Sequence, residues 1–459
     1  MQPVGENPHG IDLLRLGPVR GLIRWRGFPY VFQVAVLAAY VALAWIGWGL
    51  LTPEGVNAKL YAKANLVNLV IWGLWWPAMV WVAVLLGRVW CAVCPLEFLM
   101  GLCARARGAL GLRGRAAGGG LAGGAVAVAL FIVLQLLVPG VQQHRVPHYT
   151  SLFLITMLVG AAVSGLFLKD RAFCRAFCPI SVLLNAYGRG GMIAVRGGTG
   201  VACGGGGQLD ARSCPSRLNP PKLDGNKDCL VCGQCIKVGE DGGMRLLFRM
   251  PFSRADAREP IASWPVTLFV MTVSGFVTYE LCGVWKAAGE VFLWAPVQAT
   301  AALGLEAAGG WVQGIWTVFV VPAILWSLLG ATTVALGAAR TLGEAWRRLA
   351  MPMAVVVAAG HMAKGLEKFT SWAGYLPLAI AEPDGVQTAL GITAKSVAPP
   401  APWLSAGALS LVACLLIGAS IPLAMREARL ADPGGPRARL VPVALLGGLY
   451  LFVAIGWAG

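Results

Sequence analysis

Charged side chains are scarce in this sequence, which excludes an ordinary soluble protein. Asp, Glu, Lys and Arg make up 13% of the 459 residues, whereas hydrophobic residues make up 57%. Soluble domains carry about 25% charged residues. With a mean hydropathy of +0.69, the chain is expected to lie in a lipid bilayer. The N-terminus also lacks a short apolar stretch followed by a small-residue cleavage site, so no removable signal peptide is expected.

Two further features of the sequence limit the function. The sequence holds only four histidines and no Cys-x-x-Cys-His motif, which excludes covalently attached c-type haem. The net charge of +16 is explained by membrane topology and anionic lipid, and no feature indicates nucleic-acid binding.

Long apolar runs predict an all-α polytopic membrane protein with about nine transmembrane helices. The runs are 30–51, 66–87, 119–139, 150–168, 262–285, 311–338, 349–372, 403–425 and 440–458. Of the 37 Lys and Arg residues, few fall on the side away from the N-terminus: Lys59, Lys63, Arg145, Lys286, Lys364, Lys368 and Lys395. The positive-inside rule therefore predicts a cytoplasmic N-terminus and an external C-terminus. The membrane is expected to be a bacterial cytoplasmic (inner) membrane.

One cysteine motif occurs twice, each time after two apolar runs. The first copy is Arg88-Val-Trp-Cys91-Ala-Val-Cys94-Pro95, and the second is Arg171-Ala-Phe-Cys174-Arg-Ala-Phe-Cys178-Pro179. This pattern indicates a tandem duplication. Two pairs of thiolates supply the four ligands that a [4Fe–4S] cluster needs.

The polar stretch 170–260 contains a second cysteine pattern, Cys229-Leu-Val-Cys232-Gly-Gln-Cys235. Cys-x2-Cys-x2-Cys is the core of the bacterial ferredoxin motif, which is normally completed by x3-Cys-Pro. That fourth position is Gly239 here, so the fourth thiolate must come from elsewhere. The candidates followed by proline are Cys214, Cys178 and Cys94. Zinc is the structural alternative, although zinc ribbons use two paired knuckles and not a triple.

These motifs resemble the membrane-bound polyferredoxins, a family that includes the nitrous-oxide-reductase regulator and the membrane ferredoxin of periplasmic nitrate reductase. The resemblance covers about residues 66–240. It implies a first cluster on Cys91, Cys94, Cys174 and Cys178. It also implies a second cluster on four ligands, with Cys203 as the competing fourth: Cys214, Cys229, Cys232 and Cys235. This sequence departs from the family in its first pair, which is one residue short, and in having one cysteine triple instead of two complete runs.

The last predicted helices contain ionisable residues in unusual places. His361 and Lys364 fall in the outer half of the bilayer, three residues apart on one helix face. A histidine beside a cation could hydrogen-bond a quinone headgroup, which makes both residues quinone candidates. The alternative is a helix that ends near residue 363.

His144 and His148, in the loop between the predicted spans 119–139 and 150–168, form another pair that could bind a metal or haem. Pro147 between them disfavours a helix.

The sequence thus predicts an electron-transfer subunit with two [4Fe–4S] clusters and a quinone as a further candidate cofactor. It would connect the quinone pool, or a cytoplasmic donor, with other redox subunits such as an iron–sulfur protein or a multihaem cytochrome. The alternative is a factor that reduces or assembles copper for a respiratory enzyme. The predicted domains are a basic tail (1–29), two helix hairpins (30–169), a small loop-rich, ferredoxin-like cytoplasmic domain (170–260) and a C-terminal transmembrane domain (261–459).

Overall fold

In the computed structural model the chain forms two compact units, and segments of the two units alternate along the sequence. The structure describes residues 10–116, 124–198, 214, 216, 218–223, 225–226, 228–239, 243–251 and 259–459. The first unit, here the cysteine unit, comprises 1–38, 82–122 and 158–258. The second, here the helix unit, comprises 39–81, 123–157 and 259–459. The division falls inside three helices: α2 (Tyr30–Ile46), α5 (Trp76–Leu86) and α10 (Pro147–Phe167).

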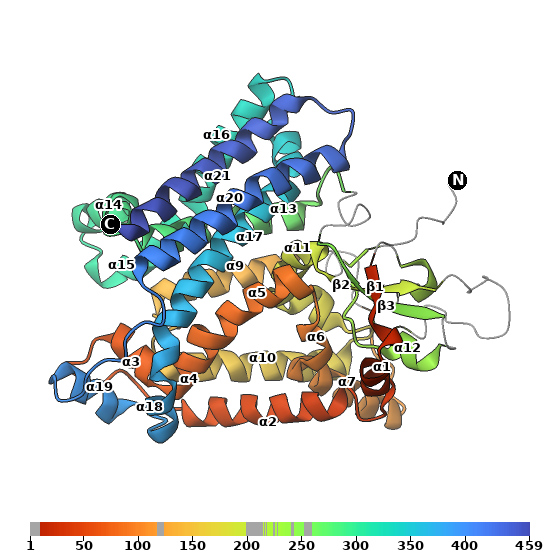
Figure 1. Ribbon diagram of the computed structural model, residues 1–459. Coiled ribbons are helices and arrows are strands. Elements are labelled where there is room, and N and C mark those ends of the chain that lie inside the picture. The colour runs from red at the N-terminus through yellow and green to blue at the C-terminus, as the bar shows by residue number, and fades with distance from the viewer. Residues whose placement is uncertain are drawn as a thin grey trace. The chain divides into compact units, whose positions relative to one another are not determined.

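The cysteine unit combines short helices with a three-stranded antiparallel sheet (Figure 1). The strands are β1 (Gly10–Asp12), β2 (Ile193–Gly197) and β3 (Met244–Arg249), in the order β1-β3-β2. The helices are η1 (Leu13–Arg15), α1 (Gly17–Arg24), α6 (Trp90–Val93), α7 (Pro95–Ala109), η3 (Phe173–Phe177), α11 (Pro179–Tyr187), η4 (Gly188–Gly190), η5 (Pro220–Lys222) and α12 (Gln234–Val238). The sequence predicts only a basic tail before residue 30, whereas residues 10–12 pair with β3.

The core of the small sheet reaches the cysteine loop. Ile23 of α1, Val195 of β2 and Ile236 of α12 are buried together with two residues of β3. Cys229 and Cys235 pack against this cluster. Apolar packing therefore fixes the second cysteine pattern against the N-terminal segment and the sheet.

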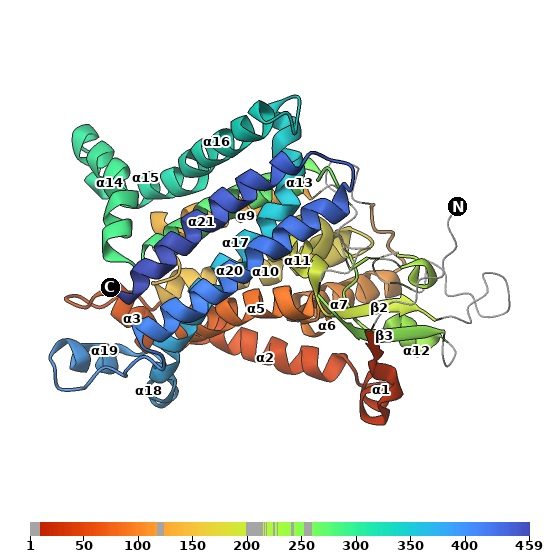
Figure 2. The same cartoon turned by 45° about the horizontal axis from the view of Figure 1, so that its top comes forward.

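The helix unit is built from long apolar helices. Its elements are α3 (Ala58–Ala64), α4 (Leu66–Asn68), η2 (Leu69–Trp75), α9 (Ala125–Gly140), α13 (Trp264–Cys282), α14 (Lys286–Leu303), η6 (Glu306–Ala308), α15 (Gly309–Ile315), η7 (Trp316–Val320), α16 (Val321–Ala335), α17 (Leu342–Trp372), η8 (Ala373–Tyr375), α18 (Leu376–Ala381), α19 (Val386–Thr393), α20 (Ala406–Ala431), η9 (Arg437–Arg439), α21 (Leu440–Ile455) and η10 (Gly456–Ala458). In this unit α17 lies beside α13, α20 and α21 (Figure 2).

A helical polytopic membrane protein is confirmed. In the part of the chain that the structure describes, seven helices are long and apolar enough to cross a bilayer. The predicted spans at 30–51 and 119–139 correspond to the shorter apolar helices Tyr30–Ile46 and Ala125–Gly140. The helix of His361 does not end near residue 363. It continues through Trp372, so Lys364 lies within it.

Candidate functional site

Both copies of the repeated motif place a cysteine immediately before a helix. Cys94 is the N-cap of α7 and Cys178 is the N-cap of α11, and the following prolines occupy the first helical position of each. Proline suits this position because the first N–H group of a helix has no intrahelical partner and its backbone angle is already helical. The Cys-Pro dipeptide therefore sets a helix start at each half-site.

The extra residue in the second copy is absorbed by a wider helical turn. Cys91 and Cys94 are linked by the short helix α6, and the Cys91 N–H donates to the Arg88 carbonyl at 3.0 Å. Cys174 and Cys178 are linked by the π-helical turn η3, where the Cys178 N–H donates to the Phe173 carbonyl at 2.8 Å. A π turn accommodates one more residue than an α turn. The departure from the family pattern in the first pair therefore leaves both motifs with the same cysteine-helix arrangement.

The structure brings the two predicted half-sites together. Electrostatic interactions link Cys174 with Cys94, Cys178 and Cys91, and all four side chains are half-buried. Burial is the main cause that raises the pKa of the Cys94 and Cys174 thiols, and it raises the pKa of Cys178 to about 11. Neighbouring thiols raise the pKa values further. Four thiolates are therefore stable together here only with a positive partner such as a metal centre.

Helix N-termini provide part of the compensation. The N–H groups of Leu96 and Glu97 act on the Cys94 sulfur and lower its pKa, although no short capping hydrogen bond forms. In the second copy the N–H groups of Ile180 and Ser181 act on Cys178 in the same way. The positive end of a helix favours an anion, so both helices stabilise a thiolate and any negatively charged cluster that it holds.

The arginines of the two copies reach across to the opposite repeat. Arg88 precedes the first pair, and its Nη1 donates to Oδ1 of Asn185 in α11 at 2.6 Å. Its Nη2 lies 4.0 Å from the Cys91 sulfur. Arg171 precedes the second pair and forms an ion pair of 2.6 Å with Glu97 in α7. Each arginine thus holds the helix that follows the other repeat's Cys-Pro, which joins the half-sites.

The second cysteine pattern also comes together with one predicted partner. Cys214 interacts electrostatically with Cys229, Cys232 and Cys235. The loop between them turns at Val231 and Gly233, which have positive φ angles of 52° and 72°. Glycine adopts such angles without strain, and an added Cβ at Gly233 would lie 2.9 Å from Ile23. The competing ligand Cys203 lies outside the described residues.

An ion pair lies between the two sets of cysteines. Glu97 interacts electrostatically with Cys174 of the first set and with Cys232 of the second, and Arg171 interacts with Cys232 as well. Gln33 of α2 donates to the second carboxylate oxygen of Glu97 at 2.6 Å. Sequence reasoning missed this acid and this amide. Two features of the sequence could have indicated them. Glu97 is an acid in the first helical turn after Cys94-Pro95, and Gln33 is a single polar residue in the apolar run 30–51.

Iron–sulfur clusters stay a prediction for the two sets of cysteines. Within the described residues, no group of three or more His, Cys, Asp or Glu side chains is arranged to hold one metal ion. A [4Fe–4S] cluster is a different case, because each of its four thiolates binds a separate iron. Two sets of four cysteines, with helix N-termini and arginines beside them, match the ligands and hydrogen-bond donors that such clusters require.

The remaining predicted site residues belong to the helix unit. His144 Nδ1 contacts the Val138 carbonyl and its Nε2 accepts from Arg145, both at 3.1 Å. His148 instead accepts from the Gly49 N–H at 3.1 Å and lies against Trp48. These contacts use the two histidines separately and do not form a shared metal site. His361 and Lys364 line a pocket of the helix unit, described below.

Comparison of the chain with family models, curated proteins and solved structures finds no match.

One prediction follows from the buried thiols. In metal-free protein, burial holds the pKa of Cys178 at about 11 and that of Cys235 at about 12. The thiolate is the reactive form, so iodoacetamide should label both cysteines slowly at pH 8. The labelling rate should rise about tenfold per pH unit up to these pKa values. Peptide mass spectrometry measures the labelling rate of each cysteine. Rapid labelling of folded protein at pH 8, in buffer without urea, would contradict the prediction.

Proposed function

We propose that this protein is a membrane-bound electron-transfer subunit that holds two [4Fe–4S] clusters. It would relay electrons between the quinone pool, or a cytoplasmic donor, and a partner respiratory redox enzyme. The resemblance of residues 66–240 to membrane-bound polyferredoxins supports this proposal independently of the geometry. When bound, such clusters each accept and release one electron.

The convergence of the two duplicated half-sites is the observation that carries the proposal. Zinc sites that stabilise small domains draw their thiolates from paired knuckles. Here the thiolates come from two helix starts, and Arg88 lies 4.0 Å from one of the sulfurs. Positive charge and N–H groups directed at the sulfurs favour the more negative, reduced state of a cluster and raise its reduction potential. The chain's own residues therefore tune a redox centre and do more than hold a structural metal.

The two sites are also electrostatically connected. Glu97 interacts with Cys174 of the first set and with Cys232 of the second, and its partner Arg171 interacts with Cys232. A change of charge in one set therefore acts on an ion pair that also faces the other set. Charges interact strongly where the surroundings exclude water. The alternative of copper handling is less well supported, because His144 and His148, the pair on which it depends, are engaged in separate contacts.

Metal analysis and electron paramagnetic resonance of anaerobically purified protein test the proposal. We expect about eight irons and about eight sulfides per chain, with reducible cubane signals. Stoichiometric zinc with almost no iron would contradict the electron-transfer function. It would leave a structural metal domain in a transporter or scaffold.

Two serine variants test the ligands of the second cluster. Cys214→Ser should lower the iron content by about four atoms per chain, because Cys214 interacts with the other three cysteines of the set. Cys203→Ser is the matched control and should keep all of the iron. The opposite result would assign the fourth ligand to Cys203.

A further inference from the structure

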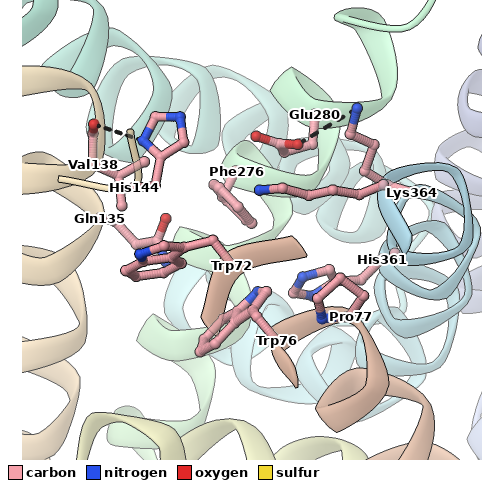
Figure 3. Close-up of a pocket in the computed structure, with 12 residues that line it drawn as sticks. Trp72, Trp76, Pro77, Gln135, Val138, His144, Phe276, Glu280, His361 and Lys364 are labelled. Carbon is pink, nitrogen blue, oxygen red and sulfur yellow. Dashed lines mark hydrogen bonds and ion pairs between the residues drawn. The ribbon is translucent and has the colours of Figure 1, made fainter. Parts of the chain in front are cut away.

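A pocket in the helix unit is lined by segments of several apolar helices (Figure 3). They are the η2–α5 segment, α9, α13 and α17, together with the loop that carries His144. Three of these four elements belong to helices that are long and apolar enough to cross a bilayer. The pocket has a cavity volume of about 40 Å³ and is partly open to its surroundings. A ligand held here would lie among apolar helices.

Aromatic rings form one side of this pocket. The His361 ring lies 6.4 Å from the ring of Trp76 and 5.7 Å from that of Phe276, measured between centroids. Trp72 lines the same space. Flat rings at such distances favour a planar aromatic ligand, which packs against them by stacking or edge contacts.

Polar groups line the opposite ends. Figure 3 shows Gln135 of α9 on one side of the pocket and His361 and Lys364 of α17 on the other. Gln135 is 5% exposed, and its Oε1 has no hydrogen-bond partner in the described residues. A buried acceptor without a partner is costly and rare in native proteins, so it indicates a missing donor.

The charges around the pocket balance one another. Lys364 contacts Glu367 at 2.8 Å and Glu280 at 3.7 Å. Lys368, which also lines the pocket, interacts electrostatically with the same two carboxylates. Ionisable groups within a membrane are costly and mark functional sites by default. Two cations matched by two carboxylates suit an uncharged ligand with polar oxygens.

We propose that this pocket binds the headgroup of a membrane quinone. One ring oxygen would face Lys364 and His361, and the opposite oxygen would face Gln135. Lysine donates to a quinone carbonyl, and histidine can donate or accept. A quinol hydroxyl would donate to Gln135 Oε1, whereas a quinone carbonyl would accept from the Gln135 amide N–H. The inference rests on the proposed function, which gives a quinone its reason to bind. The sequence indicates His361 and Lys364 as quinone candidates. The structure places Gln135, Glu280 and the aromatic side chains at the same pocket.

Photoaffinity labelling of the full-length protein in detergent tests this site. The probes are short-chain benzoquinone and naphthoquinone analogues that carry a ring azide, and peptide mass spectrometry locates the label. We expect at least one probe to label the segments around Trp76 or His361 and to be displaced by the parent quinone. Label only on other segments would overturn the proposal.

Variants make the test quantitative. Gln135→Leu and Lys364→Met should each weaken binding of the labelled quinone at least fivefold, since each removes one hydrogen bond to a ring oxygen. Gln298→Leu and Lys286→Met are matched controls on α14, where both side chains are exposed. Gln135→Leu is the sharper variant. It removes a buried polar atom that has no partner, and so it should fold at least as well as the native chain. Unchanged binding in a folded Gln135→Leu protein would overturn the role of Gln135.

Two further measurements separate the possible failures. Iron content is determined in the same samples, so full cluster loading without quinone binding would overturn the pocket but not the relay. Quinone binding without iron would overturn the relay but not the pocket. Bound phospholipid is counted as phosphate. One phospholipid per chain that disappears in Lys364→Met would assign the pocket to a lipid and overturn the quinone.

Discussion

Replacing Cys174 with serine is expected to remove one cluster and to halve the bound iron, from about eight to about four atoms per chain. Cys174 interacts electrostatically with Cys91, Cys94 and Cys178, so its loss affects the whole first set. A hydroxyl is a poorer iron ligand than a thiolate, and a cluster held at three corners is lost readily. Iron analysis and electron paramagnetic resonance measure the effect. The signals of the second cluster should remain.

Cys103→Ser is the matched control for this variant. Cys103 lies in α7, where its Cβ would be 2.8 Å from a Cβ added to Gly165. This close contact indicates a packing role for Cys103. The Cys103 variant should keep all eight irons. If Cys103→Ser loses iron and Cys174→Ser does not, the assignment of the first set is wrong.

Replacing Arg171 with methionine is expected to destabilise the cysteine unit by about 3 kcal/mol or more. The two side chains of the Arg171–Glu97 pair are only 15% and 10% exposed. Removing the cation leaves a buried carboxylate beside two sets of cysteines, and an unpaired charge in that position is costly. The thermal unfolding midpoint and the rate of iron loss on warming measure this effect. The unfolding midpoint should fall, and the rate of iron loss should rise.

Arg175→Met is the control, because Arg175 lies four residues further along the chain and is exposed. An exposed arginine contributes little to stability, so this variant should unfold like the native protein. The double variant Glu97→Met with Arg171→Met should recover much of the loss. It removes both charges and leaves apolar groups of similar size. A single Arg171→Met variant with native stability would show that the ion pair does not connect the half-sites.

Much of the candidate site could be predicted from the sequence because its signals are local. A cysteine followed by proline indicates a helix start, and the structure begins a helix at Pro95 and at Pro179. The type and spacing of the cysteines are what predicts [4Fe–4S] clusters. The membrane character follows in the same way from apolar runs of sufficient length. The helix Tyr30–Ile46 ends before its apolar run, where turns follow at residues 47–49. In the predicted span 119–139 the described residues are helical from Ala125.

The parts that sequence reasoning missed all depend on residues far apart in the chain. Gln33 donates a hydrogen bond to Glu97, which lies 64 residues further along the chain. Arg88 donates to Asn185, which lies 97 residues further along. Periodicity predicts which face of a helix is apolar, but not which distant residue packs against it.

The sequence by itself determined that the protein is helical and membrane-embedded, that a cysteine motif is duplicated, and that the thiol chemistry suits iron–sulfur clusters. Composition and spacing carry this information because it depends on near neighbours. Tertiary structure alone decided that the arginines of the repeats cross over, that residues 10–12 join the sheet, and that Gln135 faces the same pocket as His361. These features arise from long-range packing, in which burial and partner choice depend on the whole fold.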